Sequence, residues 1–113
     1  MTTLSAYALN FRGRLFPPLI SGGMGTNIST DRLALAIEKI GGIAHVSDAE
    51  LPDVCDRLFG TRFTAGKAKR FQALRTNSVK TEETFDLGAV REATLRYVGS
   101  LMERATGNGL LLI

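Results

Sequence analysis

The sequence lacks tryptophan altogether and has one cysteine and one histidine among its 113 residues. The lone cysteine, Cys55, excludes a disulfide within the chain and fits a reducing compartment. No apolar run approaches the ~18 residues that a membrane-spanning helix needs. Residues 1–7 also lack the continuous apolar segment of a secretory signal. We therefore expect a cytoplasmic protein with no membrane partner, and we predict no metal site.

Acidic residues are missing from the start of the chain. None precedes Asp31, while Arg12 and Arg14 lie among Thr and Ser, so a mitochondrial transit peptide is a weaker alternative. Over the whole sequence 14 Lys plus Arg stand against 11 Asp plus Glu. This small net charge of +3 indicates solubility rather than any particular partner.

The first segment of the sequence, residues 1–18, is predicted to be an extended lead-in that ends in Pro17 and Pro18. Two consecutive prolines hold the backbone extended. The short apolar run 19–21 follows and breaks at once into glycine, which is typical of a strand that ends in a turn. The turn consists of Gly22, Gly23, Met24 and Gly25.

A helix is predicted directly after this turn, from about residue 31 to residue 40. Residues 27–30 offer capping side chains, and Asp31 would lie in the first turn, where its charge suits the helix dipole. Gly41 and Gly42 would end the helix. The predicted buried stripe is Leu33, Ala36, Ile37 and Ile40, and the predicted solvent side is Arg32, Glu38 and Lys39.

Residues 43–46 then form a second apolar run, which suits a strand buried on both faces. Residues 19–46 therefore make a βαβ unit, and such units have parallel strands. The remainder, residues 47–113, is predicted to hold helices at 51–59, 65–74 and 86–105, a loop at 76–83 and a third strand at 110–113. We predict an α/β fold in one incomplete domain over residues 1–113.

The glycine turn is the candidate ligand site. Glycines after a strand leave bare backbone that a flat or phosphorylated ligand can approach. Two nucleotide motifs fail here: Ile28 stands at the third glycine of G-x-G-x-x-G, and a P-loop over residues 60–68 has the wrong spacing. Taken alone, the turn fits a tight structural turn or a ligand site equally well.

A resemblance favours the ligand site. The run from Pro18 to Gly25, with Ile28-Ser29, Leu33-Ala34, Ala36-Ile37 and Gly41-Gly42, resembles the opening of the nitronate monooxygenase (2-nitropropane dioxygenase) family. That family consists of FMN-dependent (β/α)₈ barrels, and the match covers about residues 17–48. Ser21 stands where the family commonly has glutamine, and Ala44-His45 where its second strand commonly has a glycine.

The resemblance implies the N-terminal part of a (β/α)₈ TIM barrel, with about three parallel strands. It implies that Gly22, Gly23, Met24 and Gly25 line the isoalloxazine of FMN, and that the whole enzyme oxidises a small nitronate or a related acidic carbon substrate. An enoyl reductase-type flavin barrel of fatty-acid or polyketide synthesis is an alternative.

The chain is shorter than the ~250 residues that a complete barrel typically needs. The phosphate site and the family's catalytic histidine would lie beyond Ile113, so we assign no catalytic residue. We expect the fragment itself to be inactive and to bind FMN poorly. Three parallel strands also expose an unpaired edge, so we expect the isolated chain to be marginally stable or to associate through that edge.

His45 and Cys55 are the residues best suited to act as a base or a nucleophile. His45 ends the second predicted strand, where a group with an unperturbed pKa of about 6.5 could act as an acid or a base. We favour a packed, hydrogen-bonded histidine. Cys55 lies near Asp53 and Asp56, whose charges would raise its thiol pKa, so we interpret it as a packing residue.

The basic segment, residues 57–80, has no acidic residue. Its cations are Arg57, Arg62, Lys67, Lys69, Arg70, Arg75 and Lys80, with Phe59, Phe63 and Phe71 between them. Such a pattern suits single-stranded nucleic acid, because cations contact phosphates and aromatic rings stack on bases. A solvated face whose phenylalanines point inward is the favoured interpretation, and the helical spacing of Phe71 and Leu74 supports it. A small basic α/β nucleic-acid-binding module is the second alternative.

Overall fold

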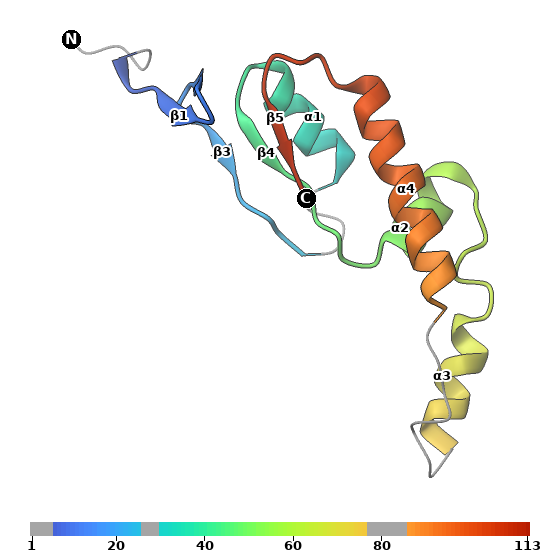
Figure 1. Ribbon diagram of the computed structural model, residues 1–113. Helices are drawn as coiled ribbons and strands as arrows, with labels where there is room; N and C mark the ends of the chain where they lie inside the picture. The colour runs from blue at the N-terminus through green and yellow to red at the C-terminus, as the bar shows by residue number, and fades with distance from the viewer. Residues whose placement is uncertain (1–5, 26–29, 77–85) are drawn as a thin grey trace. The chain divides into compact units, whose positions relative to one another are not determined.

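The computed structural model describes residues 6–25, 30–76 and 86–113 (Figure 1). Within these residues it has four helices and two sheets, one of which consists of three parallel strands. The predicted α/β class is therefore confirmed. The chain divides into two compact units: unit 1 is Met1–Ala49 with Ser100–Ile113, and unit 2 is Glu50–Gly99.

Unit 1 opens with a β-hairpin in the segment that the sequence predicts as an extended lead-in. Strand β1 (Leu9–Phe11) pairs antiparallel with β2 (Arg14–Phe16). The connecting residues Arg12 and Gly13 have φ values of 50° and 81°, as a two-residue hairpin turn requires. Since arginine rarely adopts a positive φ, the sequence gives little warning of this turn.

The parallel sheet of unit 1 contains β3 (Ile20–Ser21), β4 (Ile43–His45) and β5 (Leu110–Leu112), in that order. Ile43 of β4 is opposite Ile20 of β3 on one side and Leu110 of β5 on the other. The ladder extends past the strands, since the Val46 amide donates to the Leu112 carbonyl at 2.7 Å. All three predicted strands and their parallel direction are confirmed.

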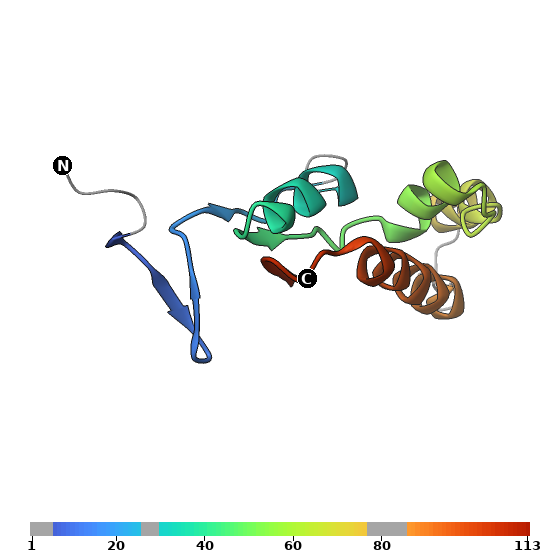
Figure 2. The same cartoon turned by 90° about the horizontal axis from the view of Figure 1, so that it is seen from above.

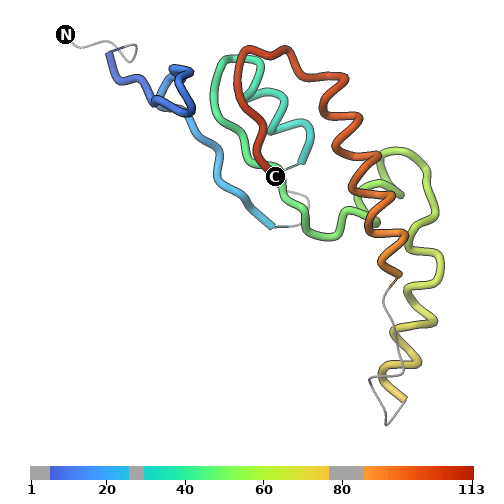
Figure 3. The backbone as a smooth tube through the Cα atoms, viewed as in Figure 1, coloured from blue at the N-terminus to red at the C-terminus, as the bar shows by residue number. Residues whose placement is uncertain are grey.

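Helix α1 (Asp31–Lys39) links β3 to β4 and lies against one face of this sheet (Figure 2). Thr30 is the N-cap residue but its side chain makes no capping hydrogen bond; the other proposed capping residues, 27–29, lie outside the described residues. Gly41 has a φ of 90°, a value that favours glycine, and ends the helix as predicted. Figure 3 traces the backbone from α1 into β4.

The predicted orientation of α1 is right only in part. Arg32 and Lys39 are exposed as predicted, and Leu33 and Ile37 are half-buried. The prediction is wrong for Ala36 and Ile40, which are exposed, and for Glu38, which is buried together with Asp31 and Ala34. The Glu38 carboxylate accepts hydrogen bonds from the Thr106 amide at 3.0 Å, the Thr106 hydroxyl at 2.9 Å and the Gly109 amide at 3.3 Å. A charged side chain can be buried when its lone pairs are satisfied in this way, and apolar spacing alone does not reveal it.

These contacts form the Glu38 lock, which we define as Glu38, Thr106 and Gly109. Burial alone would raise the pKa of Glu38, but hydrogen bonds from Thr106, Gly109 and Gly107 outweigh it and lower the pKa. The lock joins the end of α1 to the chain just before β5. At the other end of α1, Asp31 forms an ion pair with Arg104 at 2.8 Å.

Unit 2 contains α2 (Leu51–Phe59), α3 (Lys67–Thr76) and most of α4 (Leu87–Arg104). Helix α2 has Pro52 in its first turn and ends at Gly60, with a φ of 65°, as predicted. Helix α3 starts two residues later than predicted, and α4 matches its predicted bounds within one residue. The described part of the predicted 76–83 loop is Thr76, which belongs to α3.

The core of unit 2 is small. Its fully buried apolar residues come from α2 and α4: Leu51, Val54, Cys55, Ala93 and Tyr97. Helix α3 contributes no buried residue. Within the described residues it therefore buries little side-chain surface, although helices of its length depend mainly on packing for stability.

Candidate ligand site at the carboxyl edge of the parallel sheet

The carboxyl ends of the three parallel strands share one edge of the sheet in unit 1. Ser21, His45 and Leu112 are the last residues of β3, β4 and β5. The glycine turn, residues 22–25, directly follows β3 at this edge. In open α/β sheets and in βα barrels, ligands bind at the carboxyl ends of the strands.

The glycine turn presents exposed backbone. Among the described residues, a methyl group added at Gly22 or Gly25 would meet no atom within 4 Å, and one at Gly23 would only touch the Cβ of His45 at 3.9 Å. Met24 is 41% exposed. All four predicted site residues therefore lie together on the accessible side of this edge.

Other glycines of unit 1 are required by packing. At Gly42 an added methyl group would lie 3.0 Å from the Leu19 carbonyl oxygen, and at Gly109 it would lie 2.7 Å from the Glu38 carbonyl oxygen. Neither Gly22 nor Gly25 is crowded in this way, and neither has a φ in the left-handed region. Within the described residues, neither crowding nor a left-handed φ therefore explains glycine at positions 22 and 25.

His45 is hydrogen-bonded to Ser21 at the end of the neighbouring strand. Its Nδ1 lies 2.7 Å from the Ser21 carbonyl oxygen, and its backbone amide donates to the Ser21 hydroxyl at 3.2 Å. Because a carbonyl only accepts, Nδ1 carries the proton when the ring is neutral. The half-buried ring thus has the hydrogen-bonded role that the sequence favours.

Ser21 and the Ala44-His45 step are the two places where the sequence differs from the pattern of the nitronate monooxygenase resemblance. In the structure Ser21 is opposite Ala44 in the pairing of β3 with β4, and the two hydrogen bonds above join Ser21 to His45. The two places therefore lie next to each other at the carboxyl edge of the sheet.

Cys55 lies in unit 2, in the core between α2 and α4. Its thiol donates to the Ala93 carbonyl at 3.3 Å. Burial raises the thiol pKa and Asp56 adds to this effect, while Arg96 opposes it. A buried thiol with a raised pKa is a poor nucleophile, so the structure agrees with a packing role.

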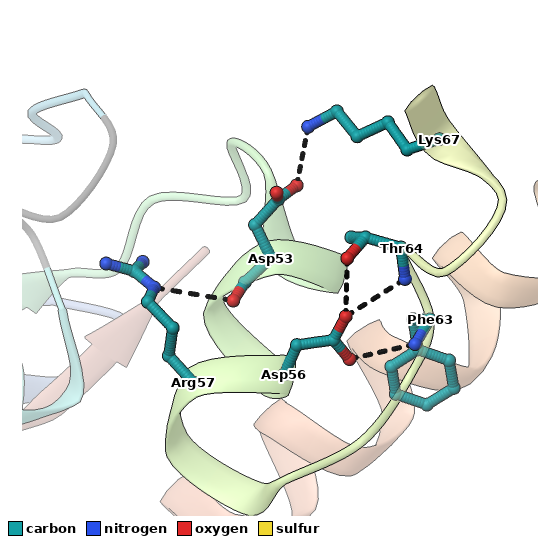
Figure 4. A network of polar contacts seen from close by, with 6 residues as sticks. All are labelled: Asp53, Asp56, Arg57, Phe63, Thr64 and Lys67. Carbon is teal, nitrogen blue, oxygen red and sulfur yellow. Dashed lines mark hydrogen bonds and ion pairs between the residues drawn. The ribbon is translucent and has the colours of Figure 1, made fainter. Parts of the chain in front are cut away.

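An Asp56 cluster, which the sequence analysis missed, forms the loop after α2 (Figure 4). The Asp56 carboxylate accepts hydrogen bonds from the Thr61 hydroxyl at 2.6 Å, the Phe63 amide at 2.8 Å, and the amide and hydroxyl of Thr64 at 2.9 and 2.6 Å. Partial desolvation would raise the pKa of Asp56, but these bonds hold it well below its ordinary value. The available signal was an aspartate followed closely by Gly60 and two threonines.

The basic segment lies along this loop and α3. Lys67 pairs with Asp53 at 2.9 Å (Figure 4). The expectation that the phenylalanines point inward is wrong for Phe71, whose side chain is 62% exposed; Phe59 and Phe63 are half-buried. The physical reason is that no part of the described chain buries a side chain of α3, so its helical spacing does not lead to burial. Lys80 lies outside the described residues.

Comparisons with known proteins give no match: no family model, no curated protein and no solved structure is significantly similar to this chain. Among the residues that the structure describes, no helix combines the length and apolar character needed to cross a membrane. The same residues contain no group of three or more His, Cys, Asp or Glu side chains that could hold a metal ion.

Proposed function

We propose that this chain supplies the first three strands of an FMN-dependent (β/α)₈ barrel of the nitronate monooxygenase type. The strand arrangement supports the proposal. β3, β4 and β5 are neighbours in chain order, all are parallel, and helix α1 covers the step from β3 to β4. A βα barrel grows in this way, with each new strand beside the previous one.

The observation that carries the cofactor proposal is the accessible glycine turn at the carboxyl edge. Among the described residues, nothing lies within 4 Å of a methyl group added at Gly22 or Gly25, so a planar ring can approach the backbone of the turn closely. Gly22, Gly23, Met24 and Gly25 would line the ring, and the methionine offers a soft, adaptable contact. FMN, when bound, would supply the electron acceptor for oxidation of the substrate.

The test of the cofactor proposal is a double substitution, Gly22→Ala with Gly25→Ala, in a form of the protein extended through the later barrel units. We expect the two methyl groups to weaken FMN binding by about tenfold or more, because they occupy the face on which the ring lies. Flavin fluorescence quenching measures the affinity. Gly99→Ala is the matched control, since its added methyl group also meets nothing within 4 Å.

The proposal fails if the double variant binds FMN as tightly as the parent protein while the control behaves normally. It also fails if the extended protein binds no flavin. The 113-residue chain itself should be inactive and bind FMN poorly; flavin absorbance that co-purifies with it would contradict that expectation.

The proposed substrate is a small nitronate or a related acidic carbon compound. The Ser21–His45 pair departs from the nitronate monooxygenase pattern at both positions, so the substrate needs a test against an enoyl reductase of fatty-acid or polyketide synthesis. Oxygen consumption with a nitronate, compared with reduction of an enoyl thioester, separates the two activities in the extended protein. If the extended protein reduced the enoyl thioester but did not oxidise the nitronate, the enzyme would be an enoyl reductase.

We propose a packing role for His45 in this enzyme. Its Nδ1 is already engaged by the Ser21 carbonyl, and His45→Asn in the extended protein should leave turnover within severalfold of the parent. A loss of several orders of magnitude would instead identify His45 as a catalytic residue.

We also propose that the isolated chain associates through an outer strand of its parallel sheet. β3 is one outer strand, and its Ile20 is 53% exposed. Open edges with apolar side chains favour pairing between chains. Sedimentation of the chain over a range of concentrations should reveal association that Ile20→Lys reduces, whereas Ile40→Lys on α1 should not.

A further inference from the structure

The basic segment is a strongly charged part of the described chain that the proposed flavin site does not use. Its described part, residues 57–76, has six cations and no carboxylate. It belongs to unit 2, whereas the glycine turn belongs to unit 1. Any role of this segment is therefore independent of the proposed function.

Two carboxylates of the described residues lie near these cations. Asp53 is paired with Lys67, and the Asp56 carboxylate accepts hydrogen bonds from Thr61, Phe63 and Thr64. Among the described residues no ion pair involves Arg62, Lys69, Arg70 or Arg75. At least four positive charges thus remain available to an anionic partner.

An aromatic ring lies within this charged surface. Phe71 is exposed, and Lys67 and Arg75 are four residues before and after it on α3, a spacing that places all three on one face of the helix. Burying a phenylalanine is normally favourable, and no element of the described chain covers this one. An exposed ring between two cations fits a ligand with flat, stackable groups on a charged backbone.

We propose that the basic segment binds single-stranded nucleic acid, with Arg62, Lys69, Arg70 and Arg75 contacting phosphates and Phe71 stacking on a base. Stacking on a single aromatic side chain tolerates any base, so binding is expected to have little sequence preference. Duplex nucleic acid fits less well, because its base faces are stacked inside the helix and cannot reach Phe71.

Two other anionic partners fit less well. A membrane surface binds helices that keep their cations off the apolar side, whereas on α3 Lys67 and Arg75 share the face of Phe71. An acidic polypeptide would satisfy the cations, but it would give the exposed ring no stacking partner. The combination of charge and exposed ring therefore selects the nucleic acid.

The test is fluorescence anisotropy of the full 113-residue chain with a labelled single strand of about 16 nucleotides. Affinity should fall as the salt concentration rises from about 50 to about 200 mM. A plot of the logarithm of the binding constant against the logarithm of the salt concentration should have a slope of about −3, because four phosphate contacts are proposed. In the triple variant Arg62→Gln, Lys69→Gln, Arg75→Gln the slope should shrink by about 2 units. Phe71→Leu should lower affinity about tenfold and leave the slope unchanged.

The control is Arg32→Gln, an exposed cation on α1 that lies outside the basic segment; it should change neither affinity nor slope. Circular dichroism checks that all variants keep their helices, as expected for exposed positions. The proposal is overturned if the chain does not bind the strand at low salt, if Phe71→Leu binds as tightly as the parent, or if polyglutamate or anionic phospholipid vesicles bind equally well.

Discussion

Units 1 and 2 each depend on a carboxylate that accepts several hydrogen bonds, but the two carboxylates lie in different surroundings. In unit 1, Glu38 is only 2% exposed, and its partners connect α1 to the chain before β5. In unit 2, Asp56 is half-buried and its partners lie within eight residues of it. The comparison teaches that similar polar clusters can hold a core together or only shape a local loop.

The largest effect is expected for Gly109→Ala, which tests whether the Glu38 lock sets the stability of unit 1. The added methyl group would clash with the Gly42 carbonyl oxygen and lie 2.9 Å from the Cα of Glu38. Because backbone cannot move aside cheaply, we expect a loss of about 3 kcal/mol or more in the free energy of unfolding. Chemical denaturation followed by circular dichroism measures it.

Gly99→Ala is the control for that change. Its methyl group meets nothing within 4 Å, and its position is inside α4. Alanine there should stabilise the chain by about 0.5–1 kcal/mol. An equally stable Gly109→Ala variant would show that unit 1 does not need the close approach of these backbones.

A smaller effect is expected for Glu38→Gln, which keeps the shape of the lock and removes its charge. Hydrogen bonds to a charged acceptor contribute more than neutral ones, so we expect a loss of about 2 kcal/mol in the free energy of unfolding. Glu103→Gln, an exposed position on α4, is the control and should be nearly neutral. If Glu38→Gln were as stable as Glu103→Gln, the charge of Glu38 would not contribute to the stability of unit 1.

Asp56 gives a local effect that depends on pH. Its folded pKa lies below the ordinary value of 3.8, so its contribution is fully present above that value and is lost as pH falls through the folded pKa. Hydrogen exchange should show protected amides at Phe63 and Thr64 in neutral solution and loss of that protection in Asp56→Asn. Asp48→Asn should leave both amides unchanged, and protection that survives in Asp56→Asn would contradict the assignment.

The smallest effect belongs to the Lys67–Asp53 ion pair on the surface of unit 2. Its two side chains are 46% and 34% exposed, and solvent screens such pairs. A double-mutant cycle with Lys67→Met and Asp53→Asn should give a coupling of about 0–1 kcal/mol that decreases with salt. A coupling that salt does not change would mean that the pair is more buried than its exposure indicates.

Much of the fold follows from patterns in the sequence. The strands β3, β4 and β5 and the ends of α1 and α2 are set by short apolar runs and by Gly41 and Gly60, which are local signals. The buried face of α1 could not be predicted, because Glu38 reaches the core through partners about seventy residues away, Thr106 and Gly109. The turn at Arg12-Gly13 was missed because arginine is unusual at a positive φ.

The candidate site, like the fold, could be predicted from the sequence only in part. Gly22, Gly23 and Gly25 were recognisable from their position after a strand, and the structure places them at the carboxyl edge. That Gly22 and Gly25 are not required for packing, whereas Gly42 and Gly109 are, depends on neighbours distant in the sequence. The exposure of Phe71 likewise could not be predicted, because the spacing of residues within α3 does not show which parts of the chain pack against that helix.

The Ser21–His45 pair also has a consequence for how this chain can evolve. Each residue would lose a partner if the other alone were replaced: a glutamine at position 21 removes the hydroxyl oxygen that the His45 amide uses, and a glycine at position 45 removes the ring that caps the Ser21 carbonyl. Substitution of either one should therefore leave an unsatisfied group at the end of a strand. Among descendants of this sequence, positions 21 and 45 are expected to mutate together rather than singly.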